Sequence, residues 1–224
     1  MQSWLAFAIF AQFLFALSTL VDKHIVTRAG TIGKPIVYAF YVALLSGFVV
    51  VLFPFVSIPS GHVLLLSLVN AATFTAAIYL LYCALSTARA SDVSPVVGGV
   101  SAIVTAILAA AWIEGDVAFV HLLPIALLAL GTAIISHFHF SKRAIFYTVA
   151  AGAFFGVTIL LGKLIFLEVS FIDGFFWPRL CNVLVALSLL LVPSFRNAIF
   201  HGGKRSSRNA KGLVIGNKIL GGVA

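Results

Sequence analysis

HVLLLSLVNAATFTAAIYLLYCALSTA, the run from His62 to Ala88, contains no aspartate, glutamate, lysine or arginine. A helix needs roughly 20 apolar residues to cross a hydrocarbon core about 30 Å thick, and inside that core every backbone N–H and C=O must be bonded within the helix. This run is long enough and apolar enough to do so. It therefore predicts a membrane-spanning helix.

Six more stretches on either side have the same character: Trp4 to Val21, Pro35 to Ser57, Val93 to Ile113, Val117 to Ser136, Ala144 to Gly162 and Gly174 to Phe195. Only the last contains a charged residue, Arg179. The whole chain of 224 residues is 62% hydrophobic and 9% charged, which leaves too little polar surface to cover a soluble domain. The predicted fold class is all-α, a polytopic transmembrane helix bundle of about seven spans.

Basic residues alternate from one predicted connection to the next. The odd-numbered connections carry eleven of them: Lys23, Arg28, Lys34, Arg89, Lys142, Arg143, Arg196, Lys204, Arg205, Arg208 and Lys211. The even-numbered connections carry acidic residues instead: Glu114, Asp116, Glu168 and Asp173. By the positive-inside rule the odd connections lie in the cytoplasm, the N-terminus lies outside, and the chain sits in the cell (cytoplasmic) membrane. The same alternation argues against nucleic acid as the partner of a chain with net charge +8.

The chain contains a second copy of its first helix. At a displacement of 140 residues, the run from Ala16 to Ile25 aligns with the run from Gly156 to Ile165. The alignment pairs Ser18 with Thr158, Leu20 with Leu160, Lys23 with Lys163 and Ile25 with Ile165. At a displacement of 139, the next helices pair Tyr38 with Trp177 and Pro54 with Pro193. The two copies are five helices apart, and an odd number of spans inverts the second copy across the membrane.

This repeat predicts two inverted five-helix units. Residues 1–140 form the first unit, and residues 141–224 form part of the second, which is incomplete. The apolar run from Gly212 to Ala224 is typical of the first half of an eighth helix. We therefore expect the natural protein to continue for about three more helices.

Several short motifs accompany the repeat. A hydroxyl residue precedes a terminal lysine in both copies, in LSTLVDK (Leu17 to Lys23) and VTILLGK (Val157 to Lys163). The third and fourth helices join through ALSTARASDVSP (Ala84 to Pro95), the fourth closes at Trp112-Ile113-Glu114, and the fifth carries Gly131. In these features the chain resembles the drug/metabolite transporter superfamily in its ten-helix, EamA-like form. The resemblance implies a secondary transporter, although Ser101 stands where this family often has a proline.

Polar and ionisable side chains inside the spans or at their ends are the candidates for a transport pathway, because a buried charge costs roughly 3 kcal/mol unless it meets water, a partner or a substrate. The candidates for substrate binding are Lys163, Arg179, Lys23, Trp177, Tyr79, Tyr82 and Asn70, and Glu114 is the candidate for ion coupling. Two cations lining a cavity favour a substrate with a carboxylate or phosphate. Plainer interpretations stay open: the cations snorkel or anchor helix ends, the tyrosines form an interfacial belt, and Glu114 is a turn residue.

Motifs for other chemistries are missing from the sequence. It has no Walker sequence and no nucleophile paired with a base, its histidines lack ligand spacing, and Cys83 and Cys181 lie inside predicted spans as small apolar residues. We therefore expect no enzyme activity, no cofactor and no metal. The expected function is secondary transport of a small-molecule substrate across the lipid bilayer by alternating access. The alternative is a non-transporting membrane scaffold or assembly protein, and a homodimer is left open.

Overall fold

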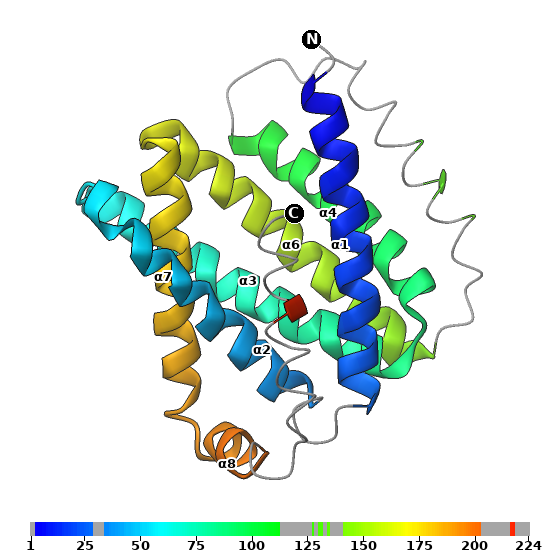
Figure 1. Ribbon diagram of the computed structural model, residues 1–224. Coiled ribbons are helices and arrows are strands. Elements are labelled where there is room, and N and C mark those ends of the chain that lie inside the picture. Colours follow the sequence, from blue (N-terminus) through cyan, green and yellow to red (C-terminus); the bar gives the residue numbers. More distant parts are fainter. Residues whose placement is uncertain are drawn as a thin grey trace.

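The structure, a computed structural model, describes residues 3–28, 34–112, 127, 130–131, 134, 141–202 and 216–217. Its helices are α1 (Ser3–Arg28), α2 (Pro35–Leu45), the 3₁₀-helix η1 (Ser46–Phe55), α3 (Gly61–Thr87), α4 (Ala90–Trp112), α6 (Lys142–Glu168), α7 (Phe171–Leu189) and α8 (Pro193–Gly202). The described residues contain no β-strand, and the helices pack into one bundle (Figure 1). The predicted all-α class is confirmed.

Six helical segments of this described part are long and apolar enough to cross a membrane: Ile9–Arg28, Pro35–Phe55, Gly61–Thr87, Ala90–Trp112, Lys142–Glu168 and Phe171–Leu189. They match six of the seven predicted spans. The seventh, Val117 to Ser136, falls largely outside the described residues, although Leu127, Leu130, Gly131 and Ile134 are helical. The chain is therefore a multi-pass membrane protein.

Serine side chains mark where three of the spans begin. The hydroxyl groups of Ser60, Ser141 and Ser170 each accept a hydrogen bond from the backbone N–H three residues later, at 3.2–3.3 Å. The first amide groups of a helix have no partner within the helix, and a serine at this position supplies one. These caps fix the first turns of α3, α6 and α7.

The last predicted span is shorter than expected. α7 ends at Leu189, before the predicted end at Phe195, because Pro193 begins a new helix, α8. α8 has 10 residues and is too short to cross a bilayer. Its Ile199 is buried in a cluster with Val37 of α2. Part of the basic connection predicted after the seventh span is thus a helix packed against the end of the bundle (Figure 1).

The second span changes its helix type half-way along. η1 continues α2 as a 3₁₀-helix of 10 residues, whereas 3₁₀ runs are seldom longer than four residues. The change occurs where the span contacts α7. Ser46 there donates hydrogen bonds to the carbonyl oxygens of Ala43 at 2.5 Å and Arg179 at 3.0 Å. Gly47 is so close to α7 that an added Cβ would lie 3.1 Å from Val183.

α1 and α6 end on opposite sides of the bundle. Lys23, near the end of α1, bonds the carbonyl oxygen of Ala88, just after the last residue of α3. Glu168, at the end of α6, pairs with His62 at the start of α3, with 3.1 Å between the carboxylate and the ring nitrogen. α3 has 27 residues and is therefore about 40 Å long. The two helices run in opposite directions, as an inverted repeat requires.

The charged ends of the spans separate in the same way. α1 and α3 end, and α4 begins, on one side of the bundle, which we call the basic end because Lys23, Arg28 and Arg89 lie there. α6 ends and α7 begins on the other side, which we call the acidic end because it carries Glu168 and Asp173.

Two glycines on α6 allow α4 to approach closely. A Cβ added to Gly152 would lie 2.7 Å from the Cβ of Val100, and one added to Gly156 would lie 2.7 Å from the Cβ of Val104. The hydroxyl of Thr105 donates to the carbonyl of Gly156 at 3.1 Å. Membrane helices associate largely through such close packing at small residues. Both contacts advance by four residues in the same direction, from Val100 to Val104 on α4 and from Gly152 to Gly156 on α6, so the two helices are parallel.

Candidate functional site

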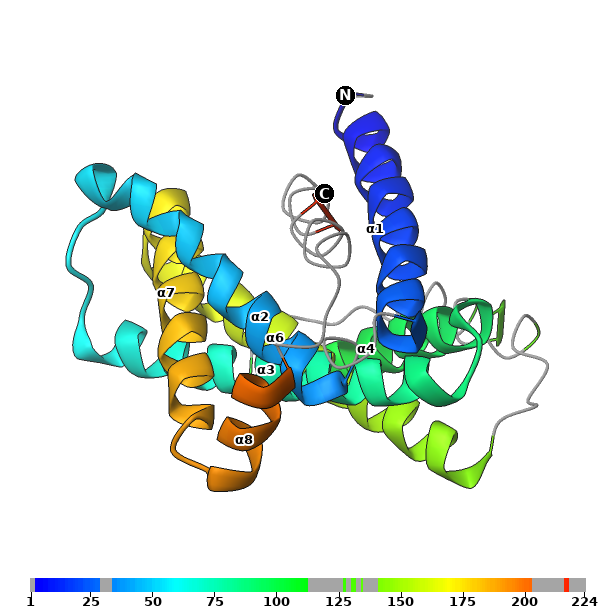
Figure 2. The ribbon, with the colours of Figure 1, turned by 60° about the horizontal axis from the view of Figure 1, so that its bottom comes forward.

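Four polar side chains meet inside the bundle near the basic end. They are Asp22 of α1, Tyr38 of α2, Tyr82 of α3 and Asn217, and we call them the Asp22 cluster. The hydroxyl of Tyr38 donates to Oδ1 of Asp22, and Nδ2 of Asn217 donates to the same oxygen at 2.6 Å. The two tyrosine rings stack with their centroids 4.4 Å apart. Figure 2 shows the short described segment 216–217, in red, between α1 and α2.

The Asp22 cluster is closed to solvent. Asp22 is 6% exposed, Asn217 is 4% exposed, and both tyrosines are fully buried. Oδ1 of Asn217 has no hydrogen-bond partner in the described structure. A buried acceptor without a donor is uncommon and calls for a physical reason. No group of three His, Cys, Asp or Glu side chains among the described residues is arranged to hold a metal ion.

A related contact joins α3 to α6. Nδ2 of Asn70 donates to the carbonyl oxygen of Thr158 at 2.7 Å, and the Thr158 hydroxyl donates to that of Thr73 at 3.0 Å. In the Asp22 cluster, Nδ2 of Asn217 likewise donates to the carbonyl oxygen of Ser18, at 3.3 Å. Ser18 and Thr158 are the residues paired by the 140-residue displacement. The two asparagines therefore bond residues that the predicted repeat pairs with each other.

The two contacts differ by one carboxylate. Asp22 accepts a second bond from Asn217, whereas the residue 140 positions later is Gly162. A Cβ added to Gly162 would lie 3.8 Å from Nδ2 of Asn70. The position that the predicted repeat pairs with Asp22 thus lies beside Asn70 but holds no carboxylate.

Lys23 caps the C-terminal end of α3. Its ammonium donates to the carbonyl oxygen of Leu85 at 2.5 Å and to that of Ala88 at 2.8 Å. The last carbonyl groups of a helix have no partner within the helix, and they form the negative end of its dipole. This contact favours the anchoring role for Lys23 that the sequence left open beside a substrate role.

Arg179 folds back on its own helix. Its guanidinium carbon lies 3.4 Å from the centroid of the Phe175 ring, and Nη1 donates to the Phe175 carbonyl at 3.3 Å. An arginine over an aromatic face gains electrostatic attraction, more so away from water. Lys163, the other cation predicted to line a cavity, is exposed on α6.

Asp173 holds the connection between η1 and α3 at the acidic end. Its carboxylate accepts hydrogen bonds from the backbone N–H of Ser57 at 2.8 Å, from the Ser57 hydroxyl at 2.7 Å and from the Ser170 hydroxyl at 2.8 Å. Trp177 donates from Nε1 to the Ser57 carbonyl at 3.1 Å. The start of α7 therefore binds three groups of Ser57: its backbone N–H, its backbone carbonyl and its side-chain hydroxyl. We call this contact the Ser57 latch.

The residues predicted for the site fall in separate places. Tyr79 is half-buried and packs against the core cluster that contains Tyr82, and Glu114 lies outside the described residues. The others are distributed along the bundle, with Lys23 and Tyr82 near the basic end, Asn70 at the contact of α3 with α6, and Trp177 and Arg179 on α7.

Sequence reasoning did not select Asp22, Tyr38 or Asn217 for the site. Asp22 was interpreted as a residue just beyond the first span, but α1 continues to Arg28 and places it inside. A signal was present for Asn217, because Asn70 and Asn217 each interrupt an apolar run that begins with a glycine. The clustering itself depends on helix packing.

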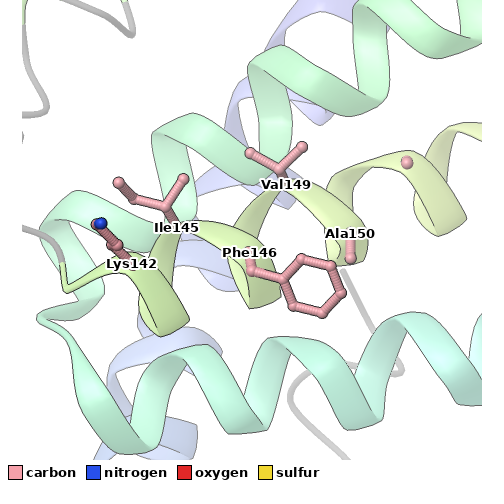
Figure 3. A pocket seen from close by; sticks show the side chains of 6 residues that line it. Lys142, Ile145, Phe146, Val149 and Ala150 are labelled. Carbon is pink, nitrogen blue, oxygen red and sulfur yellow. The ribbon is translucent and has the colours of Figure 1, made fainter.

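A hollow on the surface of α6 lies apart from these contacts. Figure 3 shows it near the basic end, lined by Lys142, Ile145, Phe146, Val149, Ala150 and Ala153. All six belong to one helix and all but Lys142 are apolar, so the hollow suits an acyl chain better than a polar metabolite. It contains none of the predicted site residues.

A comparison with protein-family models finds no match, and a comparison with curated protein sequences finds none either. The resemblance to the EamA-like transporters stays a prediction from the residues. What the chain does has to be argued from the geometry of its buried polar contacts.

Proposed function

We propose that this chain belongs to a secondary transporter that moves a small metabolite across the cell membrane by alternating access. The observation that carries the proposal is the pair of equivalent bonds, from Asn70 to Thr158 and from Asn217 to Ser18. Each bond joins one predicted unit to the repeated helix of the other, and the two repeated helices run in opposite directions. In transporters built from inverted repeats, substrates bind where the two units meet.

The Ser57 latch supports a conformation closed at the acidic end. By the 139-residue displacement, Asp173 corresponds to Lys34 and Ser57 corresponds to Arg196. A lysine and an arginine repel each other, so these positions make no equivalent latch at the basic end. A latch on one side only is what alternation between two accessible faces needs. By the positive-inside rule we propose that the basic end faces the cytoplasm.

The proposal keeps Lys163 and Arg179 as candidate contacts for a substrate carboxylate or phosphate, and Glu114 as a candidate for ion coupling. Lys163 is exposed and Arg179 lies over the Phe175 ring. None of the contacts described above pairs either cation with a carboxylate. Both cations therefore retain a capacity to bind an anion. The EamA-like assignment is part of the same proposal.

Thiol labelling separates a transporter from a membrane scaffold without knowledge of the substrate. In a chain lacking Cys83 and Cys181, we expect Ser18→Cys and Thr158→Cys to react with a small water-soluble thiol reagent in intact membranes. In a transporter, water reaches the interface of the two units, whereas in a scaffold the packed helices exclude water from that interface. Val149→Cys, in the hollow on the outer surface of α6, is the control and should stay unlabelled in lipid. If neither interface position reacts, the scaffold becomes the better interpretation.

A further inference from the structure

The Asp22 cluster contains the elements of a switch between two charge states. The carboxylate accepts bonds from the Tyr38 hydroxyl and from Nδ2 of Asn217, as an ionised group requires. The other end of the same amide, Oδ1 of Asn217, has no partner in the described structure. A rotation of the amide by half a turn exchanges the donor for an acceptor.

We propose that Asp22 is the proton-binding site of this protein and that Asn217 turns its amide over when the proton binds. A proton from water at the basic end adds to the carboxylate, and the new O–H donates to Oδ1 of Asn217. Release of the proton to water restores the carboxylate, which again accepts from Nδ2. The Asp22 carboxyl group then has a hydrogen-bond partner on Asn217 in both charge states.

Burial favours a proton over a larger ligand at this site. Asp22, Tyr38, Tyr82 and Asn217 are all at least nine-tenths buried, which leaves a metabolite no access to the carboxylate. A charge inside a membrane span is energetically costly, and protonation removes that charge. The neutral form can therefore pass through conformations that the charged form disfavours. This use of the site rests on the proposed transport function.

The charged and titratable groups around Asp22 come from several helices. Tyr38 and Tyr82 approach from α2 and α3, and Lys23 on the same helix is bonded to the carbonyls that end α3. At the start of α4, Arg89 is exposed and Asp92 accepts a bond from the Ser91 hydroxyl. Lys218, the residue after Asn217, lies outside the described residues.

By the predicted repeat, the position in α6 that corresponds to Asp22 holds no second site of this kind. Gly162 occupies the position that corresponds to Asp22, so Asn70 has no carboxylate at that place. The hydrogen bond from Asn70 to the Thr158 carbonyl of α6 is 2.7 Å long, whereas the bond from Asn217 to the Ser18 carbonyl of α1 is longer, at 3.3 Å. The asymmetry assigns proton binding to one unit and a fixed contact to the other.

Infrared difference spectroscopy on the full chain in lipid tests the site directly, because the chain has only six carboxylate side chains. Between alkaline and acidic buffer, the wild type should gain a band from a neutral carboxyl group in an apolar environment. Asp22→Asn should lose this band. Asp173→Asn, which changes the second buried carboxylate among the described residues, should keep it. Loss of the band in Asp173→Asn together with its persistence in Asp22→Asn would overturn the proposal.

A milder variant guards against misfolding of Asp22→Asn. Tyr38→Phe removes one donor from the ionised carboxylate but keeps the ring that stacks on Tyr82. Because Tyr38→Phe keeps the carboxyl group, the variant should keep the band, and loss of the tyrosine hydroxyl beside the carboxyl should move the band to a different wavenumber. A band at an unchanged wavenumber contradicts the proposal. So does a band that sodium ions remove at constant pH, since the site would then bind sodium.

This spectroscopic result is independent of transport. A band assigned to Asp22 together with unlabelled interface cysteines would retain the proton site and reject the transporter. Labelled cysteines without such a band would retain the transporter and reject the proton site.

Discussion

Replacing both Gly152 and Gly156 by valine is expected to separate α4 from α6 and to lower the free energy of unfolding by about 2–6 kcal/mol, since overpacking costs roughly 1–3 kcal/mol at each site. The added Cβ atoms would lie 2.7 Å from Cβ atoms of Val100 and Val104. The Cβ atoms of Val100 and Val104 are bonded directly to the backbone of α4 and cannot rotate away, so the two helices must move apart. Unfolding of the purified chain by a denaturing detergent, followed by circular dichroism, measures the loss.

Gly98→Val is the matched control for this packing prediction. Gly98 lies on α4, and an added Cβ would meet no atom within 4 Å. The same change of side chain is therefore expected to leave the unfolding midpoint close to that of the wild type. If the double variant unfolds together with Gly98→Val, the close contact of α4 with α6 is wrong.

Asp173→Ala is expected to release the Ser57 latch and to cost about 2–4 kcal/mol. A hydrogen bond to a charged group contributes roughly 1.5–3 kcal/mol. Ser57 and Ser170 are exposed, so water can replace part of the three bonds, and the expected loss is little more than that of one bond. The variant removes the acceptor of the Ser57 N–H and of two serine hydroxyls. Hydrogen exchange detected by mass spectrometry should show faster exchange at the Ser57 amide, and detergent unfolding should show the lower stability.

Asp92→Ala provides the comparison for the latch. The Asp92 carboxylate accepts a bond from the hydroxyl of neighbouring Ser91 in an exposed position, where such contacts contribute little. Exchange at Ser57 should be the same in this variant as in the wild type. Equal exchange at Ser57 in Asp173→Ala would show that the latch does not hold the connection.

The spans could be predicted from the sequence because the length and apolarity of a helix are local properties. Six predicted stretches appear as helices of membrane-crossing length among the described residues. Their ends were harder to predict. The first stretch was expected to end at Val21, where the apolar run stops, yet α1 continues to Arg28. The extra turns are tolerated because the Lys23 ammonium bonds the end of α3 and the Asp22 carboxylate bonds Tyr38.

The grouping of the polar side chains could not be predicted in the same way. Tyr38, Tyr82 and Asn217 are far apart in the sequence, and only the packing of their helices brings them to Asp22. The cation of Arg179 shows the opposite case. Its spacing of four residues from Phe175 already places both on one face of a helix, so this contact could be predicted from the sequence.

The inverted arrangement of α1 and α6 is most directly tested by labelling Thr27→Cys and Leu167→Cys in sealed, oriented vesicles. The two residues are 140 positions apart, both are exposed, and each lies in the last turn of its helix. The buried Cys83 and Cys181 are first replaced. We predict that a membrane-impermeant thiol reagent labels Thr27→Cys from one face of the membrane only and Leu167→Cys from the other face only. Labelling of both from the same face would contradict the inverted repeat and the transport mechanism proposed from it.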